Sequence, residues 1–280
     1  MAVVARLSGA FLRAVLMVLL VATPSLVLAD IGADTKQMVA LIALFLGVLT
    51  FVEYGAVYPG LIEFRHAPPL NRIRFLCLFL TVFLLSVIER GRVAPSDLTL
   101  VVDMAGRIVG TAIDFPYSPV RLFVLTLPEN ADHALVTAVR TAAGISYLIS
   151  LVMLTIFVIL IRMGGWPDRG TPFNVWVNLP TFDPTAGGDV IARLRRDANV
   201  NIALGFLLPF LVPAVMQAAS KGNLPVSLDS PQVLIWTMAA WSFLPASLFM
   251  RGIAMARVAE LIREQRRRAL AGERARYAPA

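Results

Sequence analysis

One glutamate stands inside the long apolar run that begins at Met38. Glu53 is the first charged side chain after Met38. A carboxylate within an apolar run is a candidate for proton or cation transfer, because burying a charge there is costly without a function. The competing interpretation is an ion pair with Arg72 or Arg74, which open the next apolar run and can extend toward water. We favour the ion pair.

The turn between these two apolar runs carries more polar residues. Residues 59–74 contain Glu63, Arg65 and His66 beside two adjacent prolines. Arginines can hold a lipid headgroup while a carboxylate or an imidazole moves a proton, so these residue types also suit a lipid-modifying enzyme. Their spacing does not join them into one catalytic constellation. We therefore predict a rigid hairpin whose exposed Glu63, Arg65 and His66 contact a partner.

Two prolines interrupt a later apolar run. Pro209 and Pro213 in LLPFLVPAV leave backbone carbonyls without donors, which can kink or break a membrane helix. Broken helices often form the binding sites of transporters. The sequence shows no matching broken segment in its other half, so an ordinary kink is the interpretation that we favour.

Several kinds of chemistry have no sequence support. The chain contains no Gly-rich phosphate loop, HExxH pair, GxSxG elbow or CxxC pair. Cys77 is the only cysteine, so an internal disulfide and a thiolate metal cluster are excluded. His66 and His133 are too few to ligate haems or to build a histidine metal site. We predict no catalytic residues, no cofactor and no metal.

The elements that position these residues are membrane-spanning helices. The chain is 58% hydrophobic and 15% charged, with a mean hydropathy of +0.75, which exceeds what a soluble domain can bury. About 20 apolar residues in a helix cross a ~30 Å membrane core. The sequence therefore predicts an all-α, polytopic membrane protein with six transmembrane helices. The expected spans are residues 1–29, 38–58, 75–90, 141–163, 201–219 and 233–250.

The first of these segments has two interpretations. Arg6 and Arg13 precede a short apolar stretch, and Ala29 supplies a small residue before Asp30, which is the pattern of a cleaved signal peptide. The alternative is a first transmembrane helix from about Ala14 to Ala29. Cleavage would leave five spans.

An amphipathic helix is predicted in the loop of residues 91–135. Between Leu98 and Phe115, polar side chains recur every three or four positions, with apolar residues opposite them. This pattern is typical of a helix on the membrane surface. We favour a helix packed as a lid on the bundle, and a lipid-specific or substrate-gating role is the alternative. The polar residues are Asp103, Arg107, Thr111 and Asp114.

Residues 251–280 form a basic tail that continues the last span as a helix. Eight arginines stand there against three glutamates. We expect the tail to bind anionic lipid headgroups at the cytoplasmic face, and docking to a partner's helix is the alternative. The arginines expected to make this contact are Arg263, Arg266, Arg267 and Arg268.

Charge also predicts the topology. If all six runs span and both termini are cytoplasmic, 18 of the 25 Lys and Arg residues lie inside and 7 outside, as expected in a bacterial-type inner membrane. The loop 91–135 is then periplasmic and the loop 164–200 cytoplasmic. This distribution accounts for the net charge of +7 without a nucleic-acid partner.

The functional prediction follows from few intramembrane charges, an amphipathic outer helix and a basic tail. These features favour a non-enzymatic accessory, scaffold or assembly protein of a larger membrane complex, in contact with the phospholipid bilayer and with other membrane-protein subunits. The alternatives are a small transporter or channel that uses Glu53, and a lipid-modifying enzyme.

Overall fold

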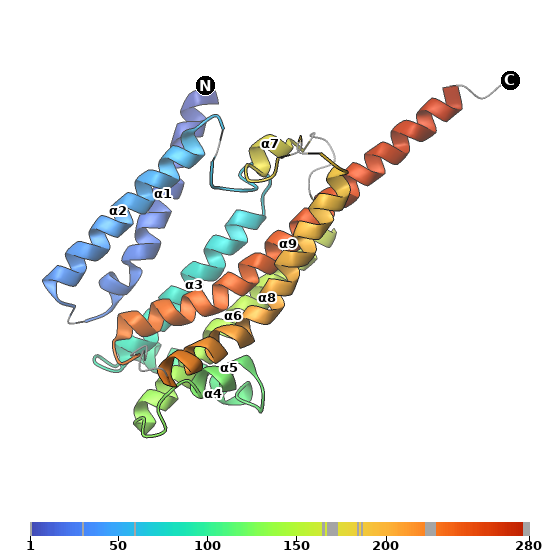
Figure 1. Ribbon diagram of the computed structural model, residues 1–280. Helices are drawn as coiled ribbons and strands as arrows, with labels where there is room; N and C mark the ends of the chain where they lie inside the picture. Colours follow the sequence, from blue (N-terminus) through green and yellow to red (C-terminus); the bar gives the residue numbers. More distant parts are fainter. Residues whose placement is uncertain are drawn as a thin grey trace.

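The computed structural model describes residues 2–29, 31–58, 60–163, 166, 173–183, 185, 187–221 and 228–276. This part of the chain is helical and contains no β-strand. Figure 1 shows its helices, which are α1 (Ala2–Val27), α2 (Ala33–Gly55), α3 (Leu70–Gly91), α4 (Asp97–Ala112), α5 (Pro119–Val124), α6 (His133–Met163), α7 (Val175–Asn178), α8 (Val190–Lys221) and α9 (Pro231–Arg276).

Six helices of the described residues are long and apolar enough to cross a membrane, which confirms the predicted fold class. They are α1, α2, α3, α6, α8 and α9. The predicted run 38–58 extends three residues too far, because the chain becomes extended at Ala56. By contrast, α9 has 46 residues, about 69 Å at ~1.5 Å per residue. It is therefore more than twice as long as a membrane core is thick.

The helix α1 is longer than the short first span that the sequence predicts. It begins at Ala2 and packs against α2 and α3. Leu20, Val21 and Ala43 form the buried centre of its contact with α2. A Cβ atom added at Gly47 would lie 2.6 Å from the Val18 side chain, so the two helices approach closely. Cleavage of residues 1–29 stays a prediction.

The helices place successive loops at alternate ends of the bundle (Figure 1). The start of α1, the turn of residues 56–69 and α7 lie at one end, which we call the hairpin end. The helices α4 and α5 lie at the opposite end, which we call the α4 end. The Arg13 guanidinium lies 4.6 Å from the ring centroid of Tyr54, so the start of α1 adjoins the end of α2. The predicted alternation of the loops is therefore present in the fold.

The helix α8 is continuous through Pro209 and Pro213, so the broken helix that the sequence offered as an alternative to an ordinary kink does not form. Pro213 lacks the N–H that would bond the carbonyl of Pro209. The indole N–H of Trp241 on α9 donates to that carbonyl instead, at 3.1 Å. A neighbouring helix thus satisfies the backbone group that the proline leaves free, as membrane interiors require.

A helix, α4, is present where the sequence predicts the amphipathic helix, but its packing differs from that of a lid with its apolar side inward. Ser96 begins it with a capping box to Thr99. Its fully buried residues are small, and Gly106 and Gly110 among them contact α6. Val102 packs against the core and is partly buried. Five other large apolar residues are exposed on the side away from the bundle; they are Leu98, Leu100, Val101, Met104 and Ile108.

The contact between α4 and α6 depends on two glycines. A Cβ atom added at Gly144 would lie 2.4 Å from the Cα of Gly110. A backbone atom cannot move aside as a flexible side chain can, so a larger residue must push the helices apart. Because Gly110 and Gly144 have no side chains, α4 can pack directly against the backbone of α6, and this contact positions the α4 end.

We expect Gly144→Ala to destabilise the protein by about 1–3 kcal/mol through overpacking. The measurement is thermal unfolding of the purified protein in a mild detergent. The matched control is Gly272→Ala, at an exposed helical position where an added Cβ meets nothing within 4 Å. An unchanged midpoint for Gly144→Ala would contradict the close crossing.

Candidate functional site

Glu63 is the centre of a buried polar network at the hairpin end. Its side chain is 8% exposed. The guanidinium of Arg251 on α9 donates to both carboxylate oxygens, with Nε at 2.6 Å and Nη2 at 2.8 Å. The hydroxyl of Thr181, in the loop after α7, donates to Oε1 at 2.6 Å. One carboxylate therefore joins three segments that lie far apart in the sequence.

The electrostatics of this network favour the ionised form of Glu63. Burial by itself raises the pKa of the carboxyl group. The hydrogen bonds from Arg251 and Thr181, together with the positive charges of Arg251 and Arg74, outweigh burial and hold the pKa below its ordinary value. Glu63 is therefore charged at neutral pH, and both of its oxygens are already occupied.

Glu53 binds the backbone of the turn that follows α2. Its Oε2 accepts hydrogen bonds from the N–H groups of Gly60 at 3.1 Å, Leu61 at 2.9 Å and Ile62 at 3.1 Å. The predicted ion pair with Arg72 or Arg74 is wrong, because these backbone donors lie closer along the chain and converge on the carboxylate. Arg72 is exposed, while Arg74 interacts electrostatically with Glu63 instead.

Arg65 closes the carboxyl end of α2. Its Nη1 donates to the carbonyls of Glu53 at 2.6 Å and Ala56 at 2.7 Å, and its Nη2 donates to Val57 at 3.1 Å. The last carbonyls of a helix have no partner within the helix, so a cation there satisfies them. The prediction that Glu63 and Arg65 are exposed is wrong, since both are buried by these contacts.

His66 remains exposed, as predicted. Its Nε2 accepts a hydrogen bond from Nε of Arg65 at 3.1 Å. Partial loss of solvation and the charges of Arg65 and Arg13 lower the pKa of the imidazole. His66 is therefore neutral at pH 7, and its ring supports the position of Arg65.

Asn178 holds the turn against α7. Its backbone carbonyl accepts from the N–H of Phe64 at 2.6 Å, and its side-chain Oδ1 accepts from the N–H of His66 at 3.0 Å. The Phe64 ring lies 5.9 Å from that of Trp166, which adds an aromatic contact. The sequence interpretation missed Arg251, Thr181 and Asn178. Arg251 had one sequence signal, because it is the first charge after the last apolar run.

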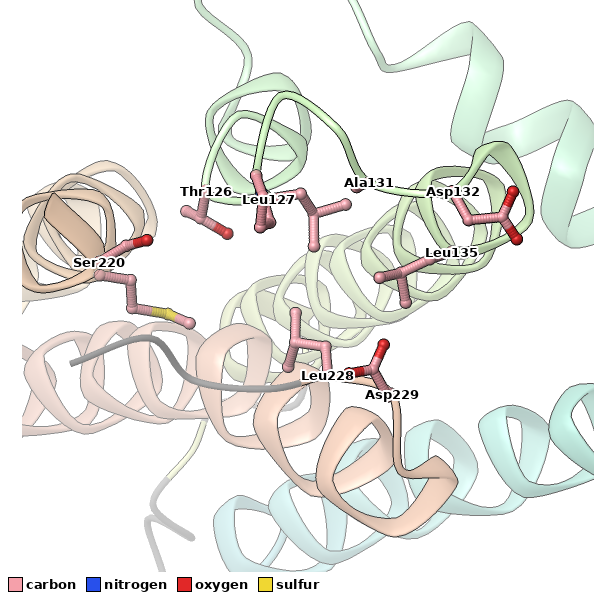
Figure 2. A pocket seen from close by; sticks show the side chains of 10 residues that line it. Thr126, Leu127, Ala131, Asp132, Leu135, Ser220, Leu228 and Asp229 are labelled. Atoms are coloured by element: carbon pink, nitrogen blue, oxygen red, sulfur yellow. The ribbon is translucent and has the colours of Figure 1, made fainter. Parts of the chain in front are cut away.

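The α4 end has a smaller polar cluster and a cavity. Asp114 pairs with Arg140 at 2.7 Å and with Arg121 at 3.4 Å. A cavity of about 460 Å³ lies between the turn after α5, the start of α6 and the residues before α9 (Figure 2). Asp132 and Asp229 contribute carboxylates to its lining. Within the described residues, no group of three or more His, Cys, Asp or Glu side chains could hold a metal ion.

Comparison with protein-family models, with curated proteins and with solved structures finds no match to this chain. The fold itself defines the class, which is a multi-pass α-helical membrane protein. The Glu63 side chain contacts α9 and the loop after α7, so it is a structural link rather than an open site.

We expect Glu63→Gln to lower stability by about 3 kcal/mol, because it leaves Arg251 and Arg74 partly buried without a countercharge. Thermal unfolding in a mild detergent measures the effect. The control is Glu260→Gln, which breaks the pair with Arg257 at 3.1 Å, where the glutamate side chain is 52% exposed. That change should cost less than about 1 kcal/mol. Equal effects of the two variants would contradict the structural role of Glu63.

Proposed function

We propose that this protein is an accessory, scaffold or assembly subunit of a larger complex in a bacterial-type inner membrane, without catalytic chemistry of its own. The observation that carries the proposal is that Glu53, Glu63 and Arg65 are occupied by structural contacts. These are three of the four residues that the sequence offered for transport or catalysis, and the fourth, His66, accepts a hydrogen bond from Arg65. All three make contacts that hold the turn of residues 56–69 in place. A rigid hairpin end suits a protein that positions partners.

The proposed orientation places the hairpin end in the cytoplasm, together with the carboxyl terminus. Its support is the positive-inside rule, since 18 of the 25 Lys and Arg residues fall in the segments assigned to that side. The turn 56–69, α7 and the end of α9 lie at this same end of the bundle (Figure 1). The loop that contains α4 and α5 is then periplasmic.

The helix α4 is proposed to lie at the membrane–water interface on the periplasmic side. A Cβ atom at Gly106 would lie 2.8 Å from the Thr141 side chain and 3.4 Å from that of Ile88. Each of these two neighbours stands next to an ionisable residue in the sequence: Thr141 next to Arg140 on α6, and Ile88 next to Glu89 on α3. The exposed apolar side of α4 therefore lies at the depth where the spans become charged, which suits an interfacial helix.

The orientation predicts the behaviour of reporter fusions. A fluorescent protein fused after residue 276 should fold and fluoresce in the cytoplasm, and alkaline phosphatase inserted at the turn of residues 128–131 should be active in the periplasm. Exchange of the two reporters should abolish both signals. Phosphatase activity from the carboxyl-terminal fusion would contradict the proposed orientation.

The proposed function predicts a stable partner. When the protein is purified from its native membrane in a mild detergent, we expect at least one membrane protein to co-purify at near-stoichiometric yield. An unrelated multi-pass protein carrying the same tag serves as the control for non-specific capture. Recovery of the chain alone under conditions that keep other native complexes intact would contradict the proposal.

A further inference from the structure

With residues 231–250 as the stretch that crosses the membrane, the last third of α9 lies well beyond the apolar core. Arg251 is the first charge after the apolar stretch from Pro231 to Met250, which is about as long as the ~30 Å core is thick. At ~1.5 Å per residue, Arg263 lies about 18 Å beyond Arg251 along the helix and Arg267 about 24 Å beyond it. Even a helix tilted by ~40° would hold Arg267 about 18 Å above the apolar core.

A compact cap of protein fills the space between the apolar core and these arginines. Met255, Val258 and Ala259 of α9 are buried there against Leu179 and Leu194. At the top of the cap, Arg266 pairs with Asp189 at 2.7 Å, just before α8 begins. From Gln265 to Gly272 the described side chains are exposed, and Figure 1 shows α9 extending alone beyond the rest of the fold.

One side of α9, from the edge of the cap into this extension, carries two arginines and a leucine. Arg263 is partly buried at the edge of the cap, whereas Arg267 and Leu270 are exposed. Arg263, Arg267 and Leu270 follow the spacing of residues on one side of a helix. Neither Arg263 nor Arg267 has an ion-pair partner among the described residues. Leu270 is 57% exposed. A short helix with no packing partner is only marginally stable in water, so an exposed face of this kind gains stability from a bound surface.

The distance of these arginines from the membrane decides whether lipid headgroups or an acidic protein surface can bind them. Headgroups occupy only about 5–8 Å outside the apolar core, and salt screens exposed charges over a Debye length of about 8 Å. The estimated ~18–24 Å height of Arg267 therefore leaves it more than one Debye length from the lipid phosphates. An acidic protein surface can reach Arg267 at that height and Arg263 about one helical turn below it, and it can also cover Leu270.

We propose that the Arg263–Arg267–Leu270 face of α9 docks an acidic protein surface in the cytoplasm, in place of the lipid contact expected from the sequence. The inference rests on the proposed function, because it specifies where and by what chemistry the scaffold holds a partner. Carboxylates on the partner pair with the two arginines, and an apolar residue of the partner packs on Leu270.

The test places a photo-crosslinking residue, p-benzoylphenylalanine, at position 270 of the full chain in its native membrane. We expect an adduct with a protein, in which the crosslinked segment, identified by mass spectrometry, carries net negative charge. The double variant Arg263→Glu/Arg267→Glu should reduce the adduct by about tenfold. The double variant to Lys keeps both charges and should retain most of it. Thermal unfolding of each variant checks that the fold is intact.

The matched control carries the same crosslinker in place of Leu207, an exposed apolar residue on α8 within the span, which should form lipid adducts. Lipid adducts at position 270, no adduct there, or a protein adduct that charge reversal leaves unchanged would each overturn the inference. If a partner still co-purifies in any of those cases, the proposed function stands and only its docking face is wrong. Without a co-purifying partner, both proposals fail.

Discussion

The ion pair between Glu63 and Arg251 is the interaction on which the hairpin end depends. Removing a carboxylate and a guanidinium from water is costly, and the cost is offset only when geometry and further hydrogen bonds are favourable. Here Arg251 binds both carboxylate oxygens, and Thr181 donates to one of them. Because these three residues come from the turn, α9 and the loop after α7, the pair holds those segments in one arrangement.

The membrane imposes a second constraint, because its interior offers no water to satisfy polar groups. Buried hydroxyls in the spans bond carbonyls of their own helices, as Thr81 does to Cys77 at 2.8 Å and Ser146 to Ala142 at 2.7 Å. The Trp241 indole performs the same task for Pro209 between helices. These side chains thus satisfy polar groups that lipid and apolar side chains cannot.

The polar residues in and before the turn show that the sequence identifies candidate residues better than it predicts their contacts. Residue type and position identify Glu53, Glu63 and Arg65, but they predict an exposed Glu63 and Arg65 and an ion pair for Glu53, which instead accepts from backbone N–H groups. Their actual partners are mostly backbone groups of the turn itself. Residue types do not show which N–H groups and carbonyls a turn will direct at a side chain, since that depends on the folded path of the backbone.

The sequence by itself determined six apolar helices, a further helix within residues 98–115 and the continuation of the last span into a basic helix. Hydrophobicity, helical spacing and charge are local properties, so they can be assigned residue by residue. Only the tertiary structure decided that Glu63 meets Arg251, 188 residues away, and that α4 turns its glycines inward. Such contacts depend on which helices pack together and how closely, and no local pattern in the chain specifies that packing.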